Sequence, residues 1–146
     1  MRYKDEGNVH LAFHGVGNAC IRYLREEYGM ETLREIFRRT AQRVYKDIYE
    51  RLKEGDSEAL AEHWEYYLQR EGGEYTIARD EDQTVLTISR CPAIACMRQR
   101  GLAPDEAFCK TTKMLNDGFS EGTPLRITTE ILGDGKCIQT IKERRP

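Results

Sequence analysis

The period of the hydrophobic pattern changes once along the chain, at Gly72-Gly73. Before this pair, apolar residues recur every three to four positions, which is typical of amphipathic helices. After it, the segments YTIARD and QTVLTISR are short, rich in β-branched residues and separated by a polar turn, which is typical of two paired strands. We therefore expect a helical part over 8–71 and an α+β part over 74–143.

Three helices are predicted in the helical part, over about 8–28, 31–54 and 57–70. Gly29 and Gly55 are C-cap signals that end the first two. Each predicted helix has one apolar stripe and otherwise charged faces, so one side is expected to pack and the others to be solvated.

In the α+β part, Cys91-Pro92 directly follows the second strand. Because proline favours the first turn of a helix, Cys91 is expected near the N-cap of a short helix. The elements expected after the first strand pair are helices over 92–100 and 104–118 and strands over 124–132 and 136–143. The fold class is therefore α+β: N-terminal helices followed by a mainly antiparallel four-stranded sheet with two interposed helices (ββααββ), the helices lying on one side.

The last two strands flank Gly133-Asp134-Gly135, a hairpin signal. With Asp134-Gly135 as a two-residue type I′ turn, Leu132 pairs with Cys137. Cys137 would then share a face with Glu130 and point away from the β-branched core. A slip of one residue would reverse this assignment.

Composition limits the class of protein. The 146 residues fit one domain over 1–146, with 39% hydrophobic and 33% charged residues. The formal net charge is −2, so the chain does not have the excess of basic residues that is typical of a nucleic-acid-binding protein. No apolar run has the length of a membrane span, and MRYKDEGN is not a secretory signal, so a cytoplasmic location is expected.

An odd number of cysteines, five, argues against a complete disulfide framework, and cytoplasmic thiols are expected to be reduced. There is no CxxC pair, so any metal site must be assembled from distant parts of the fold. Cys20 and Cys96 are interpreted as packing residues. Cys109 and Cys137 are either site residues or small hydrophobes.

Cys91 has the strongest local argument for reactivity. Exposed N–H groups and the helix dipole at a helix N-terminus favour the thiolate, which is both the nucleophilic and the metal-binding form. The alternative is a small buried residue in place of an ordinary N-cap residue. His10 and His14 lie one turn apart on the inward face of the first predicted helix. They either occupy a site or are core-edge histidines with hydrogen-bond partners.

The spacing of Cys91-Pro92, Gly101, Phe108-Cys109, Asp117-Gly118-Phe119 and Gly133-Asp134-Gly135-Lys136-Cys137 resembles the L-2-amino-thiazoline-4-carboxylic acid hydrolase family. That family is related to 4-vinyl-reductase-type small-molecule domains, in which late cysteines can hold zinc. The resemblance covers roughly 90–140. It implies hydrolytic opening of a cyclic amidine, with Cys91, Cys109 and Cys137 matching the family pattern.

Two functional hypotheses follow. In the first, the chain is a cysteine-dependent hydrolase of a small molecule. Cys91 attacks an amidine-like carbon, or Cys91, Cys109 and Cys137 hold zinc or another transition metal that activates water. Acid–base candidates are His14, with His10 and His63 as alternatives, and Glu130.

In the second hypothesis, the chain is a 4-vinyl-reductase-like small-molecule-binding or sensor module, and the cysteines form a structural or ligand-binding metal site. A third alternative is a homo-oligomeric accessory protein that uses its charged helices as the interface. Neither nucleic acid nor membrane is expected as a partner.

Overall fold

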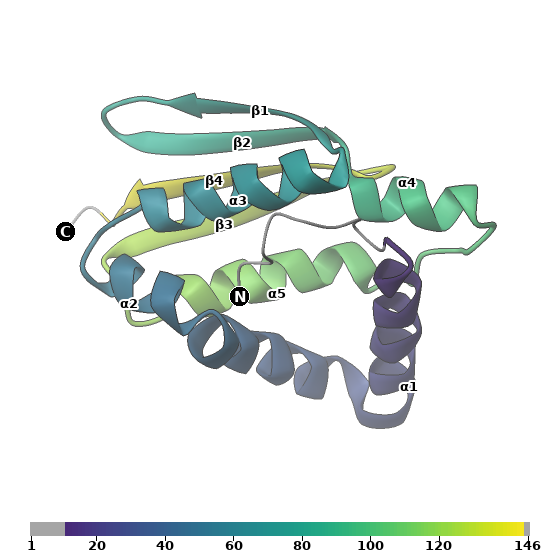
Figure 1. Cartoon of the computed structure of the whole chain (residues 1–146). Helices are drawn as coiled ribbons and strands as arrows, with labels where there is room; N and C mark the ends of the chain where they lie inside the picture. Colours follow the sequence, from purple (N-terminus) through teal and green to yellow (C-terminus); the bar gives the residue numbers. More distant parts are fainter. Residues whose placement is uncertain (1–10, 145–146) are drawn as a thin grey trace.

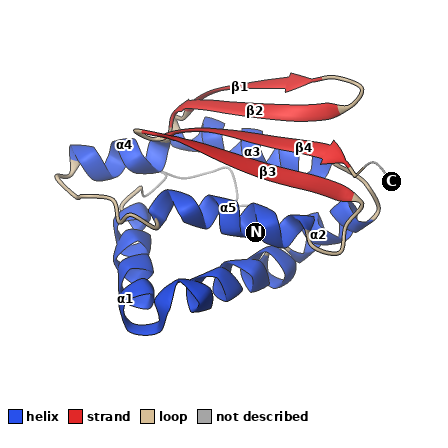
Figure 2. Ribbon diagram, turned by 180° about the vertical axis from the view of Figure 1, so that it is seen from behind, coloured by secondary structure: helices blue, strands red, loops and turns tan. Residues whose placement is uncertain are grey.

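Helices cover one face of an antiparallel sheet in the computed structural model, which describes residues 11–144 (Figures 1 and 2). The α+β fold predicted from the sequence is confirmed. The elements in chain order are α1 (Phe13–Arg39), η1 (Thr40–Val44), α2 (Lys46–Lys53), α3 (Glu58–Glu71), β1 (Glu74–Arg79), β2 (Gln83–Arg90), α4 (Pro92–Gln99), α5 (Phe108–Ser120), β3 (Leu125–Gly133) and β4 (Lys136–Glu143).

The first helix turns sharply at Gly29, where φ is 79° (Figure 1). This is the left-handed region that glycine adopts without steric penalty, so the predicted break is present at the expected residue. The second predicted helix is divided, because a π-helical turn, η1, separates the end of α1 from α2. Nothing in the hydrophobic spacing signals this turn.

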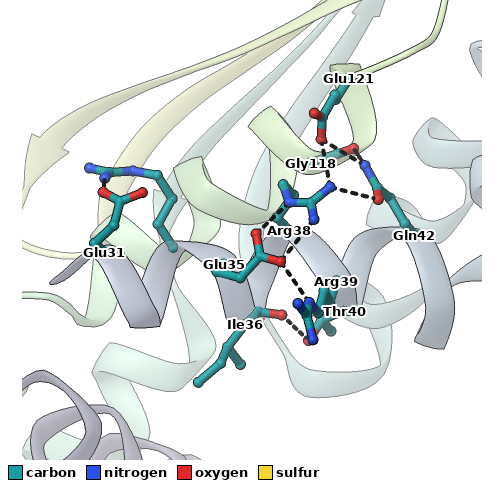
Figure 3. A network of polar contacts seen from close by, with 10 residues as sticks. Glu31, Glu35, Ile36, Arg38, Arg39, Thr40, Gln42, Gly118 and Glu121 are labelled. Carbon is teal, nitrogen blue, oxygen red and sulfur yellow. Dashed lines mark hydrogen bonds and ion pairs between the residues drawn. The ribbon is translucent and has the colours of Figure 1, made fainter. Parts of the chain in front are cut away.

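The helical part packs closely against α5 at Gly118. A Cβ atom placed on Gly118 would lie 2.9 Å from the Cα of Arg38 and 3.0 Å from the Cβ of Ala41. Around this contact, Gln42 Nε2 donates to the Gly118 carbonyl at 3.3 Å, and Arg38 Nη1 donates to Glu121 at 3.1 Å (Figure 3). Glycine is required here because the two helix backbones approach too closely for a side chain.

The sheet has strand order β1-β2-β4-β3, and all neighbours are antiparallel. Its helix-facing side supplies the main core together with α3, α2 and α5. The largest buried side chains of this core include Leu60, Trp64, Leu68, Leu86, Phe119, Leu125 and Ile141. Trp64 is 3% exposed and packs in this core.

The predicted register of the last hairpin is wrong by one residue. The turn at Asp134-Gly135 forms, with positive φ at both residues. However, an irregularity between Ile131 and Gly133 makes Leu132 an extra residue, so that Cys137 pairs with Ile131. Because side chains alternate along a strand, Cys137 lies on the core-facing side, two residues from buried Gln139.

The helix predicted to begin at Pro104 begins later, at Phe108. Asp105 is the reason, because its buried carboxylate accepts a hydrogen bond from the Ala107 N–H at 2.9 Å and from Arg25 Nε at 3.0 Å. The guanidinium of Arg25 holds the pKa of Asp105 below its usual value. Asp105 therefore anchors the loop before α5 to α1.

The outer faces of the helices carry ion pairs, as the charged pattern predicts. Lys53 lies 2.7 Å from Glu50, and Lys113 lies 2.8 Å from Asp117, both one turn apart on a helix. No helix within residues 11–144 combines the length and the apolar character that crossing a membrane requires.

Candidate functional site

Cys91 occupies the N-cap position of α4, as predicted, with Pro92 in the first turn. Its backbone N–H donates to the carbonyl of Gly135 at 2.9 Å. Gly135 is buried, and a Cβ atom there would lie 3.1 Å from the Cβ of Ile94 and 3.5 Å from the Cβ of Cys91. The turn between β3 and β4 is therefore packed directly against Cys91.

The Cys91 thiol is half-buried, and burial raises its pKa above the ordinary value. The backbone N–H groups of Ile94 and Ala93 act in the opposite direction, but their effect is smaller. The predicted thiolate is thus wrong for the resting protein. Desolvation of the charged form outweighs the helix N-terminus, so Cys91 is a neutral thiol near neutral pH.

Cys109 and Cys137 lie near Cys91, although they come from different elements. Burial raises the pKa of Cys137 to about 11; a hydrogen bond from Gln139 opposes this, and the neighbouring Cys91 and Cys109 add to it. The pKa of Cys109 is raised by burial and then by Cys91. We call these three residues the cysteine cluster. Each of these three thiols, which the sequence singled out, takes part in a mutual influence on pKa.

Tyr67 of α3 contributes its hydroxyl to the same region. Burial raises the pKa of this hydroxyl well above its usual value, and Cys91, Cys137 and Glu71 raise it further. A hydrogen bond with Gln139 acts in the opposite direction. Tyr67 therefore remains protonated at neutral pH and is available as a hydrogen-bond donor.

Glu71, the last residue of α3, joins His14 to the cysteine cluster. The Oε2 atom of Glu71 lies 3.0 Å from Nε2 of His14, and the two side chains are only 14% and 11% exposed. Glu71 also raises the pKa of Cys91, although burial raises it more, so the charge of the carboxylate acts on that thiol. His14 thus reaches the site through Glu71, as a core-edge histidine with a partner.

Sequence reasoning did not identify Glu71 or the hydroxyl of Tyr67 as site residues. Glu71 is a charged residue before a helix-ending glycine, which is a common surface pattern. Tyr67 lies in the apolar stripe of α3, a pattern typical of a core residue. Only the packing of α3 against the sheet brings both side chains to Cys91 and Cys137.

Glu130 is not part of this site, which corrects the prediction that placed it beside Cys137. It pairs with Ile138 on β4 and is exposed on the opposite face of the sheet. The displaced register is the cause. His63 lies against the rings of Tyr45 and Tyr67, at centroid distances of 5.1 and 5.6 Å. His10 falls outside the described residues.

A buried polar network supports the cysteine cluster from the core side. Asn116 of α5 donates to Gln139 Oε1 at 2.6 Å and to Thr129 Oγ1 at 2.8 Å. Gln139 is 1% exposed, and its Nε2 lies 3.8 Å from the Cys137 sulfur. Because each amide is held by several partners, the network holds Gln139 in the orientation that meets Tyr67 and Cys137.

Cys91 is also reached from outside. A surface pocket with a volume of about 340 Å³ is lined by Cys91, Ser89, Ile94, Arg98 and neighbouring residues of α4 and β2. Arg98 lies at the rim, where its guanidinium donates to Asp134 at 3.1 Å. Cys91 therefore has one side toward the cysteine cluster and one side toward a space that a small molecule can enter.

The metal alternative has no geometric support. Across residues 11–144, no group of three or more His, Cys, Asp or Glu side chains is arranged so that it could hold a metal ion. The raised pKa of each thiol also disfavours the thiolate that zinc requires. The three cysteines, as they are placed, do not fit a zinc centre.

Comparison with protein families finds no family model that matches the chain, and comparison with curated proteins finds no match. The functional interpretation therefore depends on the site itself. Its elements are the pocket at Cys91, the cysteine cluster with Tyr67, and the Glu71–His14 pair.

Proposed function

We propose that the chain is a cysteine-dependent hydrolase that opens a cyclic amidine of small size, as the L-2-amino-thiazoline-4-carboxylic acid hydrolase resemblance implies. The observation that carries the proposal is the position of Cys91, whose thiol lines a surface pocket and whose pKa is raised by burial and, to a smaller extent, by the carboxylate of Glu71. The proposal assigns the nucleophile to Cys91, the base to Glu71 and the orientation of that base to His14.

The neutral thiol determines the first step. Cys91 must lose its proton as it attacks, and Glu71 is the nearby carboxylate that accepts it. His14, in its Nε2–H form, donates to Glu71 and holds that carboxylate in place. Because the Glu71–His14 pair is largely shielded from water, the carboxylate keeps a defined orientation.

The reaction is balanced in three steps. The Cys91 sulfur bonds to the amidine carbon, the electron pair of the ring C=N bond moves to the ring nitrogen, and the thiol proton passes through Glu71 to that nitrogen. The lone pair of the other amidine nitrogen then re-forms a C=N bond as the ring C–N bond breaks, and the leaving nitrogen takes a second proton from that other nitrogen, which leaves a thioimidate on Cys91. Water adds to the thioimidate carbon and gives one proton to the remaining nitrogen; its second proton passes through Glu71 to sulfur as the C=O bond forms and the C–S bond breaks. One water is consumed and the thiol is regenerated.

Tyr67, Cys109 and Cys137 would form the inner wall of the site. Tyr67 keeps its proton and can donate a hydrogen bond to the nitrogen on which negative charge develops. Cys109 and Cys137 remain neutral thiols in this proposal and act by packing. A cytoplasmic location, which the proposal includes, would keep all three thiols reduced.

The experiment measures ring opening of 2-aminothiazoline carboxylates and unsubstituted cyclic amidines by the purified chain. Cys91→Ala should abolish turnover while circular dichroism and the thermal midpoint remain close to wild type. Cys20→Ala is the matched control, because Cys20 is exposed on α1, which also corrects its interpretation as a packing residue. Full turnover by Cys91→Ala would refute the nucleophile assignment.

The second candidate is a small-molecule-binding or sensor module. The raised pKa of all three thiols favours it, because un-ionised cysteines can serve as apolar lining. In that case, calorimetry would detect ligand binding that survives Cys91→Ala, and no product would form with either protein.

A further inference from the structure

The sheet has a second face that no described helix covers. Figure 2 views the sheet from this side, and α3 and α4 lie behind the strands. The middle of this face is a cross-strand row of small and β-branched residues formed by Ala78, Val85, Thr140 and Thr128. We call the face that carries this row the open face. The side chains of these four residues are short and uncharged.

Charges lie on either side of this row. Two residues before Thr128 on β3, Arg126 lies directly opposite Lys142 of β4. Two residues after Thr128, Glu130 lies opposite Ile138. Arg126 and Lys142 make one side of the row positive, and the other side carries the Glu130 carboxylate and, two residues before Ile138 on β4, the exposed Lys136.

The positive side is unfavourable in the isolated chain. Like charges directly opposite each other on one face of a sheet repel. Both side chains are exposed, and neither forms an ion pair among residues 11–144, although both line a surface hollow that the carboxylates of Asp117 and Glu143 also line. Glu130 is likewise exposed and lacks an ion-pair partner in that part of the chain. The open face thus has unpaired charges of both signs, separated by an uncharged row.

This arrangement is self-complementary under one symmetry operation. A two-fold axis along the row Ala78–Val85–Thr140–Thr128 turns a second copy over onto the face. After this rotation, each strand of the second copy lies opposite the same strand of the first copy. The two sides of the row are exchanged, so the side with Arg126 in one copy faces the side with Glu130 in the other. Arg126 of each copy then faces Glu130 of the other, and Lys142 lies diagonally from the same carboxylate. The two middle rows pack against each other.

We propose that the open face is the interface of a homodimer, in which two sheets pack face to face about this axis. Face-to-face packing of antiparallel sheets is a standard arrangement, and threonine, valine and alanine rows suit it. Self-complementarity is what a two-fold interface demands, because the same surface is used by both copies. The occupant is therefore a second copy of this chain.

The helices that carry the candidate site lie on the other side of the sheet, so the dimer leaves the pocket at Cys91 outside the interface. The charged outer faces of α1 and α2 are not used. The interface thereby differs from the helix-based oligomer considered from the sequence alone.

The molar mass in solution tests the proposal, measured by sedimentation velocity over a hundredfold range of concentration. The wild-type chain is expected to reach twice the monomer mass of 17.0 kDa. Arg126→Glu and Glu130→Arg should each weaken dimerisation by at least tenfold, because each places like charges together. The double variant Arg126→Glu/Glu130→Arg should recover the dimer, because it restores the opposite pairs.

A substitution in the row Ala78–Val85–Thr140–Thr128 provides a second test of the dimer interface. Thr128→Arg should give a monomer, while Thr32→Arg, an exposed threonine on α1, should leave the dimer intact. A wild-type monomer at every concentration would overturn the proposal. A dimer that persists in Thr128→Arg would place the interface elsewhere and would also overturn it, as would failure of the double charge variant to recover dimerisation.

Discussion

The Oε2 atom of Glu71 lies 3.0 Å from the Nε2 atom of His14, and the same carboxylate raises the pKa of the Cys91 thiol. These two side chains come from the end of α3 and the beginning of α1. Their contact brings the helical part of the chain to the cysteine cluster.

Glu71→Gln is predicted to reduce the rate of ring opening by about 10²–10⁴-fold, because the amide cannot accept the Cys91 proton. Initial rates measured against Glu74→Gln, an exposed neighbour in β1, isolate the effect of this carboxylate. Equal rates for the two variants would show that Glu71 does not act as the base in ring opening.

The protein is predicted to lose stability as pH rises from about 9 toward 11. The pKa of Cys137 is about 11 in the folded chain against an ordinary value of 9.0, so unfolded chains ionise first. The neutral thiol therefore stabilises the fold below the lower value, and this contribution disappears as pH passes the higher one. Urea unfolding at pH 8, 9.5 and 11 measures the slope. Cys137→Ala should flatten it, and an unchanged slope would contradict the assignment.

Gly118→Ala is predicted to destabilise the fold by about 1–3 kcal/mol, because the new methyl group meets the backbone of α1. Gly17→Ala is the matched control: Gly17 is also helical, a Cβ there meets nothing within 4 Å, and the change should stabilise by roughly 0.5–1 kcal/mol. Chemical denaturation measures both. A neutral Gly118→Ala would mean that α1 and α5 approach less closely.

Asn116→Ala is predicted to cost about 1–3 kcal/mol, because it leaves the buried Gln139 carbonyl without its donor. It should also lower ring-opening activity, since Gln139 bonds to Tyr67 beside the cluster. Asn116→Asp tests the polarity of the contact. It replaces the donor with an acceptor and should be at least as damaging in both measurements.

The sequence predicted correctly those features of the structure that depend on residues adjacent in the chain. Pro92 after a strand placed Cys91 at a helix N-terminus, and Gly29 marked the turn of α1. The predicted register of the β3–β4 hairpin was wrong, because the turn signal at Asp134-Gly135 does not reveal that Leu132 is an extra residue before the turn. That one residue put Cys137 on the wrong face and placed Glu130 in the site.

The candidate site was predictable only in part, since its cysteines share a sequence pattern but its base does not. Glu71 acts on the pKa of Cys91 because of where the fold places α3, and no local spacing in the sequence signals this relation between distant residues. The ionisation of Cys91 was mispredicted for a related reason. The helix N-terminus is a local feature, whereas the burial that outweighs it is produced by the whole fold.

Trapping the covalent intermediate tests the proposed nucleophile most directly. A cyclic amidine substrate is mixed with the wild-type chain, the reaction is quenched in acid within one turnover, and the modified peptide is identified by mass spectrometry. The predicted result is a substrate-derived mass on Cys91 that appears and decays with turnover and is absent from Cys91→Ala. Turnover that proceeds with no adduct on Cys91, or with an adduct only on Cys109 or Cys137, would contradict it.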